Sequence, residues 1–381
     1  MKSILIVSSG YPTDEDPDYA FIQPIARCFA DSGLKCTVLA PQSITKIILH
    51  QKKRRGYKWF DKTKKGNSVT IFQPYYFSAS NLCIGRSQIS SLLKMHAVKK
   101  CYRKERIDAE VFYAHFWDCG VIASTISKKK SSPLFVASGE SRVNVCECFS
   151  NRIVKKALPF ISGIICVSSK NLIESEKLGL LLDNSKAVVI PNGYNPTEFY
   201  IEDKTIARKH LGIALNEFIV IYVGEFCERK GPDRVIEATK NISNARLIMI
   251  GWGDKIAESE QIIFKGSVPH DQLVHYLNAA DVFVLPTLAE GCCNAIVEAM
   301  ACGLPIISSN LTFNDDILDE TNSIRVDPMN VEEIADAIRL LSIDQELRQK
   351  LSQGSRKIAV NLTIQKRTER ILSFIEGLLH G

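Results

Sequence analysis

Short apolar runs alternate with helix-like patterns along the whole chain. Each run ends in small or polar residues, as the buried strands of a parallel sheet do. In the first half these runs are Ile4–Ser8, Cys36–Ala40, Val111–His115, Leu134–Ala137 and Ile164–Ser168. In the second half they are Phe218–Val223, Arg246–Ile250, Val282–Pro286 and Pro305–Ser308. The alternation predicts an α/β fold with parallel sheets covered by helices on both faces.

A seam divides the chain into two such sets of strands. The segment from Val188 to Pro196 reads as a strand followed by Pro and Asn-Gly turn signals, which places a boundary near Tyr194. Residues 1–195 carry a net charge of +14, whereas residues 196–381 carry −8. A chain of 381 residues is long enough for two open-sheet domains, so we predict one on each side of the seam.

Composition narrows the class of protein. Hydrophobic residues make up 45% of the chain and charged residues 24%, which is typical of a globular protein. No apolar run has the length of a membrane span, and the apolar start at Met1–Val7 is too short for a secretory signal. The twelve cysteines form no CxxC pair and no Cys/His group at zinc spacing. We therefore expect a cytoplasmic protein with reduced thiols and no metal site.

The stretch Glu290–Pro305 has the most specific chemistry. It predicts a turn at Gly291 and then a helix over Asn294–Cys302, whose first amides favour an anion such as a diphosphate. Glu298, one turn into this helix, is placed to accept hydrogen bonds from ribose hydroxyls, and Glu290 from a sugar ring. The alternative is a pair of solvated glutamates, but the small and apolar neighbours of Glu298 favour a bound partner.

A second loop of interest is Gly224–Asp233, which follows another predicted strand. Pro232 suits the first turn of the next helix, so Lys230 lies at the carboxyl edge of the sheet, where open α/β sheets bind ligands. Lys230 can neutralise a leaving diphosphate, and Arg229 offers a bidentate alternative. A solvated turn lysine is the plain alternative.

Two residues of the first half have similar positions. His115 ends a predicted strand and could hydrogen-bond a sugar hydroxyl, the alternative being a structural histidine. Gly10 follows the first strand and would let the backbone approach a ligand closely. A single glycine is not a dinucleotide-binding motif.

Together these residues resemble the retaining GT-B glycosyltransferases of family 4, also called the glycosyl transferases group 1. The most specific match is the EX7E motif, formed by Glu290 to Glu298 and continued to Pro305. Ile190–Gly193 resembles the family's interdomain segment, and His115 matches the histidine at the end of an N-terminal strand. Residues 266–270 and 280–286 are similar to the stretch that holds the nucleotide base through main-chain contacts.

The resemblance implies a GT-B fold, in which two Rossmann-like doubly wound domains face one another across a cleft. An N-terminal domain over residues 1–194 would bind the acceptor, and a C-terminal domain over residues 195–363 would bind the nucleotide sugar. A helix within residues 364–381 would cross back to the N-terminal domain. The resemblance also implies catalysis without a metal or any other cofactor.

The expected catalytic residues are Glu290 at the donor sugar, Lys230 at the diphosphate and His115. Glu298 is expected at the ribose. The other expected donor-binding residues are Arg229, Gly291, Cys292, Cys293, Asn294, Val268 and Gly10.

Two positions depart from the family pattern. Glu225 replaces a frequent arginine, so either its carboxylate points away from the diphosphate or Arg229 compensates. Cys292–Cys293 replaces a frequent Phe-Gly, and a Cβ at residue 293 restricts the close approach that glycine allows. We expect a site shaped for its own donor sugar.

The predicted reaction transfers a sugar from a nucleotide diphosphate donor, a UDP- or GDP-sugar, to a glycan or glycolipid acceptor in surface polysaccharide synthesis. The anomeric configuration would be retained. Another GT-B activity, such as a nucleotide-sugar epimerase or a phosphorylase, and a non-catalytic binding partner stay open.

A basic run, Lys52–Lys65, interleaves aromatic side chains at Tyr57, Trp59 and Phe60. It could sit peripherally on the inner face of an anionic membrane, where a lipid-linked acceptor is presented; the alternative is a solvated loop. Nucleic acid is a poorer partner because no nucleic-acid-binding module occurs in the chain.

Overall fold

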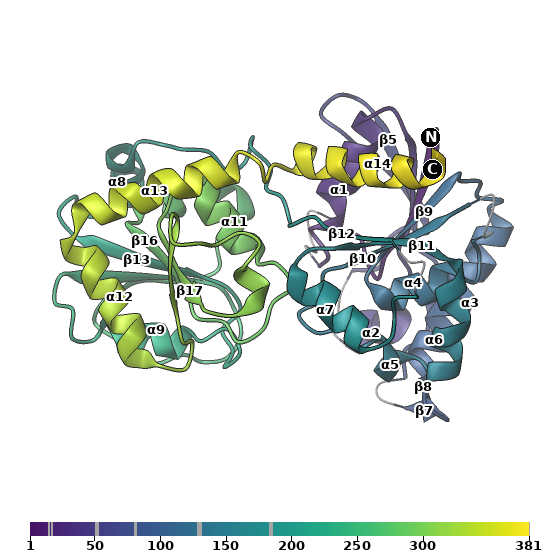
Figure 1. Ribbon diagram of the computed structural model, residues 1–381, viewed down its shortest axis with the longest axis horizontal. Helices are drawn as coiled ribbons and strands as arrows, with labels where there is room; N and C mark the ends of the chain where they lie inside the picture. Colours follow the sequence, from purple (N-terminus) through teal and green to yellow (C-terminus); the bar gives the residue numbers. More distant parts are fainter. Residues whose placement is uncertain are drawn as a thin grey trace. The chain divides into compact units, whose positions relative to one another are not determined.

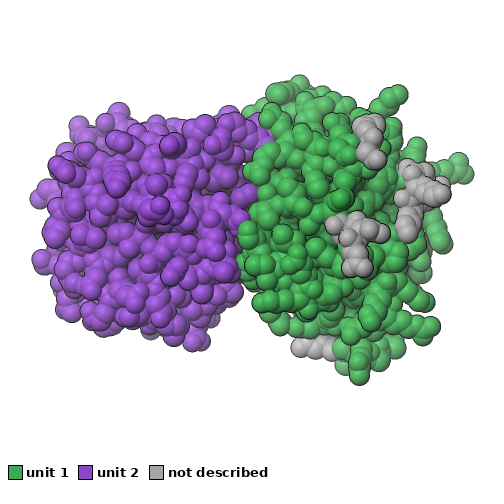
Figure 2. All heavy atoms as spheres, viewed as in Figure 1, with its two compact units in different colours: residues 1–190, 368–381 green, residues 191–367 purple. Residues whose placement is uncertain are grey.

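The computed structural model describes residues 1–13, 16, 18–49, 53–79, 82–127, 132–182 and 186–380, without the side chain of His380. The chain divides into two compact units (Figure 2). Unit 1 comprises Met1–Ile190 and Thr368–Gly381, and unit 2 comprises Pro191–Arg367.

Within the described residues, unit 1 is built on an eight-stranded sheet in the order β12-β11-β10-β9-β1-β2-β5-β4 (Figure 1). All neighbouring strands run parallel except β4, which is antiparallel to β5. The strands are β1 (Ser3–Val7), β2 (Lys35–Leu39), β4 (Lys58–Lys62), β5 (Ser68–Phe72), β9 (Val111–His115), β10 (Leu134–Ser138), β11 (Ile161–Cys166) and β12 (Lys186–Val189).

The helices of unit 1 connect and cover these strands. They are α1 (Ile22–Asp31), α2 (Ile44–Leu49), α3 (Ile89–Lys104), α4 (Trp117–Ala123), α5 (Val145–Cys148), α6 (Asn151–Ala157), the short 3-10 helix Leu158–Phe160 and α7 (Ser169–Lys177). Two small two-stranded sheets pair β3 (Gln42–Ser43) with β6 (Tyr75–Tyr76) and β7 (Cys83–Ile84) with β8 (Ser87–Gln88).

The central strands of unit 1 are apolar on both faces because helices cover both. The four residues Ile4–Val7 of β1 and all five residues of β9 are buried. Trp117, the first residue of α4, is fully buried in the same core. This is the pattern of a parallel sheet with no solvated face.

Unit 2 repeats the plan with a six-stranded parallel sheet in the order β15-β14-β13-β16-β17-β18. Its strands are β13 (Phe218–Val223), β14 (Ala245–Ile250), β15 (Ile262–Gly266), β16 (Val282–Leu285), β17 (Ile306–Ser309) and β18 (Ser323–Val326). Its helices are α8 (Lys204–Leu211), α9 (Pro232–Thr239), α10 (Leu273–Ala279), α11 (Asn294–Ala301), α12 (Val331–Ile343) and α13 (Gln345–Ala359), with 3-10 turns at His270–Gln272 and Thr312–Asn314.

Several helices of unit 2 begin and end at chemically suitable residues. Asp203 caps α8 by accepting hydrogen bonds from two first-turn amides, and Gly212 ends it in the left-handed conformation. Asn330 caps α12 in the same way, and Asp344 caps α13 by accepting a hydrogen bond from the amide of Leu347. Side-chain oxygens at these positions satisfy first-turn amides that have no partner inside the helix.

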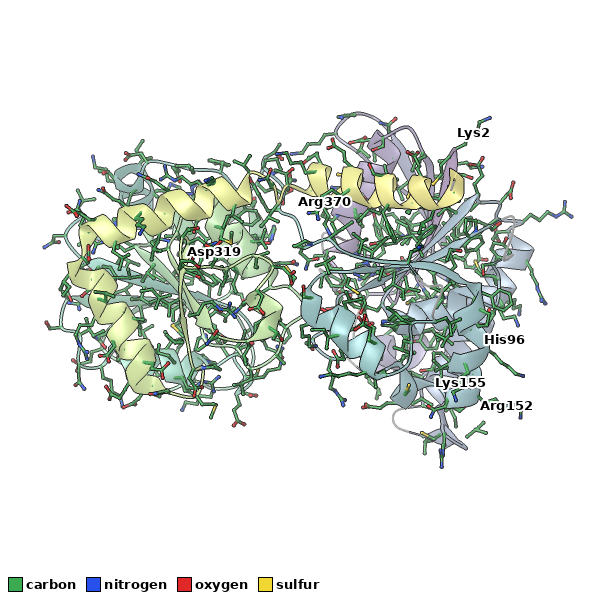
Figure 3. All side chains as sticks on the ribbon, in the orientation of Figure 1. Lys2, His96, Arg152, Lys155, Asp319 and Arg370 are labelled. Atoms are coloured by element: carbon green, nitrogen blue, oxygen red, sulfur yellow. The ribbon has the colours of Figure 1, made fainter. Side chains whose placement is uncertain are left out.

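The last helix, α14 (Ile364–His380), begins in unit 2 and ends in unit 1. Within unit 1, the ring of Phe374 lies edge-on to Phe135 with 6.1 Å between centroids. Arg370, labelled in Figure 3, donates to the carbonyl oxygen of Val189 at 3.1 Å. The missing Cβ of Gly163 leaves room for Phe374 and Leu378.

The strands predicted from the apolar runs are confirmed, with ends that differ by no more than three residues. The alternative of a solvated loop for the basic run Lys52–Lys65 is wrong for Lys58–Lys62, because these residues form the edge strand β4. Its side chains alternate between exposed and covered, because only one side of an edge strand faces the core. The twelve cysteines all lie in the described residues, and none of them is in a disulfide.

Candidate active site

The sheet of unit 2 has a point where the direction of its crossovers reverses. The chain leaves β13 through α9 to reach β14 on one side, and leaves β16 through α11 to reach β17 on the other. Strands β13 and β16 are direct neighbours. Loops diverge at such a point and leave room for a ligand. Lys230 follows β13, and Glu290 follows β16.

Lys230 and Glu290 form an ion pair at this point, with 2.6 Å between Nζ and Oε1. Both side chains are 12% exposed. Thr287 donates its hydroxyl to the same Oε1 at 2.8 Å, and Arg229 donates Nη1 to it at 3.1 Å. Within the part of the chain that the structure describes, no hydrogen bond or ion pair reaches Oε2. One carboxylate oxygen is thus fixed and the other is open.

Lys230 keeps its positive charge. Burial by itself lowers the pKa of Lys230, but the charge and hydrogen bond of the Glu290 carboxylate help to raise it above the ordinary value. Burial also raises the pKa of the Cys293 thiol, which therefore stays protonated near neutral pH. The group next to Glu290 is a cation beside a neutral thiol.

Arg229 joins the two loops. Its Nη1 donates to the carbonyl oxygen of Ala289 at 2.9 Å, and its own carbonyl accepts from the amide of Leu288 at 2.8 Å. Its Nη2 lies 3.5 Å from the carboxylate of Glu225. The acid that replaces the family's arginine is therefore balanced by Arg229.

The turn from Gly291 to Asn294 leads into α11. Cys293 occupies the N-cap of α11 and makes no capping hydrogen bond. Asn192 holds this turn: its side-chain amide donates to the carbonyl of Cys292 and to Oδ1 of Asn294, each at 2.8 Å. The helix start is thus positioned by Asn192 while its first turn has no side-chain oxygen capping it.

Glu298 lies on α11 with its side chain 14% exposed. His270 stands beside it, with Nε2 3.6 Å from Glu298 and Nδ1 3.6 Å from Glu198. The imidazole packs edge-on against the ring of Phe199, at 5.1 Å between centroids. The hydrogen bond with Glu298 raises the pKa of His270 above its ordinary value. Val268, two residues earlier, is half-buried.

Sequence reasoning missed three residues of this region. The sequence pattern places His270 only within the segment expected to make main-chain contacts, and Asn192 only within the interdomain segment. The third is Trp252, which is 69% exposed in the loop that follows β14. A tryptophan between two glycines at the end of a buried strand was an available signal for it.

Unit 1 has its own reversal point, between β1 and β9. The chain leaves β1 through α1 towards β2 and leaves β9 through α4 towards β10. Asp118, in the first turn of α4, accepts from Lys94 Nζ at 2.8 Å and from Ser9 Oγ at 3.3 Å, both at Oδ2. Lys94 comes from α3 and also contacts Ser9 at 2.5 Å. Burial favours neutral forms here, yet the carboxylate of Asp118 holds the pKa of Lys94 well above its ordinary value.

His115 ends β9 and is buried among aromatic rings. Its ring stacks on Phe21 at 5.0 Å between centroids and lies 4.6 Å from Phe116. Phe116 adopts a φ of 78°, a strained value for a residue with a Cβ. Glu140 supports this turn by accepting the amide of Trp117 at 2.7 Å.

Gly10 has a role inside unit 1. A Cβ on Gly10 would lie 2.3 Å from the ring of Tyr19, so the position must be glycine for that ring to pack. Its predicted contact with the donor stays a prediction.

The described part of the basic run is largely tied to unit 1; Lys52 lies outside the described residues. Arg55 pairs with Asp16 at 2.7 Å. Tyr57 donates its hydroxyl to Glu105 at 2.9 Å, and Trp59 donates its indole N–H to Gln73 at 2.8 Å. Among the three interleaved aromatic residues, Phe60 is the exposed one.

In the described part of the chain, no group of three or more His, Cys, Asp or Glu side chains is arranged to hold a metal ion. None of the described helices combines the length and the apolar character that a membrane crossing requires.

The chain matches known proteins along most of its length. A model of the family described as glycosyl transferases group 1 matches residues 203–358. A putative teichuronic acid biosynthesis glycosyltransferase, TuaC, of Bacillus subtilis is 26% identical over 349 residues, which is 88% of each chain. This chain is a glycosyltransferase, and its residues 203–358 match the group 1 family. A second relative of the enzyme is an Escherichia coli galactosyltransferase, described as UDP-Gal:alpha-D-GlcNAc-diphosphoundecaprenol alpha-1,3-galactosyltransferase. It is 25% identical over 323 residues, 77% of this chain and 82% of that protein.

Solved structures share the fold of this glycosyltransferase. The sucrose-phosphate synthase of Thermosynechococcus elongatus superposes with a TM-score of 0.80 at 18% identity, covering 100% of both chains. Anabaena HepE, solved with UDP-glucose, superposes with a TM-score of 0.69 at 18% identity, covering 99% of this chain and 100% of that one. The fold is GT-B, with two Rossmann-like α/β units.

Proposed function

We propose that the enzyme transfers a sugar from a nucleotide diphosphate donor to a glycan or lipid-linked acceptor, with retention at the anomeric carbon. The observation that carries the proposal is the Lys230–Glu290 pair at the reversal point of unit 2, directly before the uncapped start of α11. A lysine ammonium and the first amides of a helix are groups that together bind a diphosphate.

In this proposal the diphosphate lies against the start of α11 and the ammonium of Lys230. An ammonium has three N–H donors, so Lys230 can keep its contact with Glu290 and still donate to phosphate oxygens. Arg229 adds a second positive charge to the loop. When the donor breaks, negative charge grows on the diphosphate, and these groups stabilise it.

Glu290 and Glu298 would hold the two ends of the donor. Oε1 of Glu290 is fixed by Lys230 and Thr287, which leaves Oε2 to accept a hydroxyl of the donor sugar. Glu298 lies on α11 beyond the anion site and would accept the ribose hydroxyls. A carboxylate accepts two such bonds from a vicinal diol at little entropic cost when its rotamer is already restricted.

The bond between the anomeric carbon and the diphosphate oxygen breaks, and a bond from the acceptor oxygen to the same face of that carbon forms. The acceptor's hydroxyl proton passes to the departing diphosphate oxygen, so no protein nucleophile is needed. The acceptor would bind at the carboxyl edge of the unit 1 sheet, where Lys94, Asp118 and His115 gather polar and aromatic groups.

The names of relatives suggest the pathway class. The name of the B. subtilis relative specifies teichuronic acid biosynthesis. A Staphylococcus aureus relative is 27% identical over 210 residues, and its name specifies capsular polysaccharide biosynthesis. The name of the E. coli relative specifies a lipid-linked acceptor. We therefore propose a role in surface polysaccharide synthesis, with a UDP-sugar as the first donor to test because the HepE structure contains UDP-glucose.

The test is a thermal-shift panel with UDP-, GDP-, ADP- and dTDP-sugars on the wild type and on Glu298→Ala. We expect one nucleotide series to raise the melting temperature of the wild type and to lose most of that shift in the variant. Transfer with the positive donor is then followed by NMR of the new anomeric centre. No shift with any nucleotide sugar would contradict the donor site, and an inverted product would contradict retention.

A further inference from the structure

Unit 1 has a group of exposed apolar side chains on neighbouring segments. They come from α2, from the segment after β6, and from the β7–β8 hairpin, and each is between 64% and 72% exposed. They are Ile48, Leu49, Phe77, Leu82 and Ile84. Single exposed apolar residues are ordinary, whereas a group on adjoining segments marks an interaction surface.

Hydrogen bonds join these segments into one continuous part of the surface. The Ser78 hydroxyl pairs with that of Ser43 at 2.7 Å, and the Ser78 amide donates to Thr45 Oγ1 at 3.1 Å. The next amide, of Ala79, donates to Ser90 Oγ at 2.9 Å at the start of α3. The amide of Leu82 donates to the carbonyl of Ala79 at 3.0 Å. In Figure 1, β7 and β8 project from the end of unit 1.

The charge of this region is strongly one-sided. Residues 41–100 contain thirteen Lys and Arg but a single acidic residue, Asp61. That carboxylate is already bound: it accepts the hydroxyl of Tyr11 at 2.7 Å and pairs with Arg27 at 2.7 Å. No described carboxylate of residues 41–100 is therefore left to balance the basic side chains.

Basic residues lie around the apolar ones. Lys46 is exposed on α2, and Arg86 is exposed in the hairpin between β7 and β8. Arg54 lies over the ring of Tyr75 at 4.3 Å, next to the β3–β6 pair. On the hairpin side, the amide of Ser150 donates to Ser87 Oγ at 2.9 Å. This hydrogen bond holds the start of α6 next to β8. Helix α6 adds two basic residues to this part of the surface, Arg152 and Lys155, which are labelled in Figure 3.

We propose that this surface docks unit 1 on an anionic lipid bilayer. The five apolar side chains enter the interfacial region, and Lys46, Arg54 and Arg86 pair with lipid phosphates. The docking rests on the proposed function in one respect: a lipid-linked acceptor would be presented at the bilayer. It relocates the membrane contact, because Tyr57 and Trp59 of the basic run are engaged inside unit 1.

A bilayer fits this surface better than a second copy of the chain. A symmetric dimer places the same patch of both copies face to face, so its basic residues would meet one another. Like charges at close range oppose that contact, whereas an anionic leaflet attracts them.

The experiment is co-sedimentation of the full chain with vesicles. One set consists of phosphatidylcholine, and the other of equal parts phosphatidylcholine and phosphatidylglycerol. We expect the wild type to bind the anionic set and to be released by salt. The variant Ile48→Ser/Leu49→Ser/Ile84→Ser should bind those vesicles about tenfold or more weakly, because three buried apolar contacts are lost. The variant Lys46→Gln/Arg54→Gln/Arg86→Gln should lose the preference for anionic vesicles.

The matched control makes the same chemical change elsewhere. Ile343→Ser/Ile206→Ser replaces two exposed isoleucines of unit 2 and should leave vesicle binding unchanged. All variants alter exposed side chains, so their melting temperatures should stay near that of the wild type. Wild type that stays in the supernatant, or a triple apolar variant that binds as wild type does, overturns the proposal. A dimer in light scattering that the apolar variant dissociates overturns it in favour of a second copy.

This result is separable from the proposed function. A nucleotide-sugar thermal shift without vesicle binding would remove the docking surface and leave the glycosyltransferase proposal intact. Vesicle binding without any donor shift would do the reverse.

Discussion

The two units place a lysine–carboxylate pair at the same topological position, but the helix starts beside the pairs differ. In unit 1 the first amide of α4, that of Trp117, is already taken by the carboxylate of Glu140 at 2.7 Å. In unit 2 the N-cap of α11 is Cys293, which makes no capping hydrogen bond. The helix start in unit 1 is thus capped by a carboxyl group of the same unit, whereas the helix start in unit 2 has no capping oxygen.

The counter-charges differ as well. Glu290 forms ion pairs with Lys230 at 2.6 Å and with Arg229 at 3.1 Å, so one cation would still contact it if the other were removed. Asp118 has one ion pair, with Lys94 at 2.8 Å, among the described residues. Such a difference suits a diphosphate in unit 2 and neutral sugar hydroxyls in unit 1. Four variants break or sharpen this comparison.

The largest expected effect is on catalysis at unit 2. Lys230→Ala should lower the transfer rate about a hundredfold to a thousandfold, because it removes a cation from the charge that develops on the diphosphate. Stability should change little, since Arg229 still faces Glu290. The measurement is release of nucleoside diphosphate, with Lys240→Ala, an exposed lysine paired with Glu237, as the control. A rate within threefold of the wild type would remove Lys230 from the mechanism.

At unit 1 the corresponding change should act on stability. Lys94→Met leaves the Asp118 carboxylate without its ion-pair partner and should cost about 2 to 4 kcal/mol of unfolding free energy. Urea denaturation measures this cost, and Lys94→Met/Asp118→Asn should recover part of it. The donor-induced thermal shift should persist in both variants. If Lys94→Met lowered the unfolding free energy no more than Lys230→Ala does, the proposed difference would be wrong: Asp118 would not depend on its single cation more than Glu290 depends on one of its two.

Glu140 gives the comparison a pH dependence. Burial raises the pKa of Glu140 from 4.5 to about 7, although hydrogen bonds from the amide of Trp117 and the hydroxyl of Ser138 oppose it. A carboxyl whose pKa is higher in the folded state stabilises the fold at low pH, and this contribution is lost as pH rises from about 4.5 through 7. The free energy that corresponds to this pKa change is about 3 kcal/mol.

The matching variant is Glu140→Gln, which cannot ionise. Thermal melting is measured from pH 5 to pH 8 for the wild type and the variant. The stability of the wild type relative to the variant should decline as the pH rises towards 7, because the pKa of Glu140 is raised from 4.5 to about 7 in the folded state. A difference that does not depend on pH would mean that Glu140 has an ordinary pKa.

The smallest expected effect is at His270. Its pKa is raised by Glu298, so its contribution to stability is present below the ordinary value of 6.5 and lost as pH rises through the raised value. The imidazole is 61% exposed, which limits the effect to a few tenths of a kcal/mol. His270→Gln melts compared at pH 6 and pH 8 test it. An equal loss at both values would point to packing against Phe199 instead.

The positions of Lys230, Glu290 and Glu298 on loops and helix could be predicted from the sequence. Strand, loop and helix signals around them are local, and the carboxyl ends of parallel strands share one edge. The helix over Asn294–Cys302 was expected and is found as α11, Asn294–Ala301. The assigned roles of these residues stay predictions until the variants are measured.

Contacts between distant segments could not be predicted. Lys94 and Asp118 are separated by 24 residues, and Asn192 and Cys292 by 100, so no periodicity links them. The exposed apolar group of Ile48, Leu49, Phe77, Leu82 and Ile84 could not be predicted either, because apolar residues in short segments have the same pattern whether they are buried or exposed.

The sequence by itself determined the repeated α/β plan and the helix that contains Glu298, because periodicity, turn residues and helix ends are local properties. The tertiary structure decided which charges meet. Glu290 forms ion pairs with two cations and Asp118 with one, among the described residues. The first amide of α4 donates to Glu140, whereas the start of α11 has no capping oxygen. The physical reason is that side-chain pairing depends on distances between elements, which are fixed when sheets and helices pack and are absent from any local pattern.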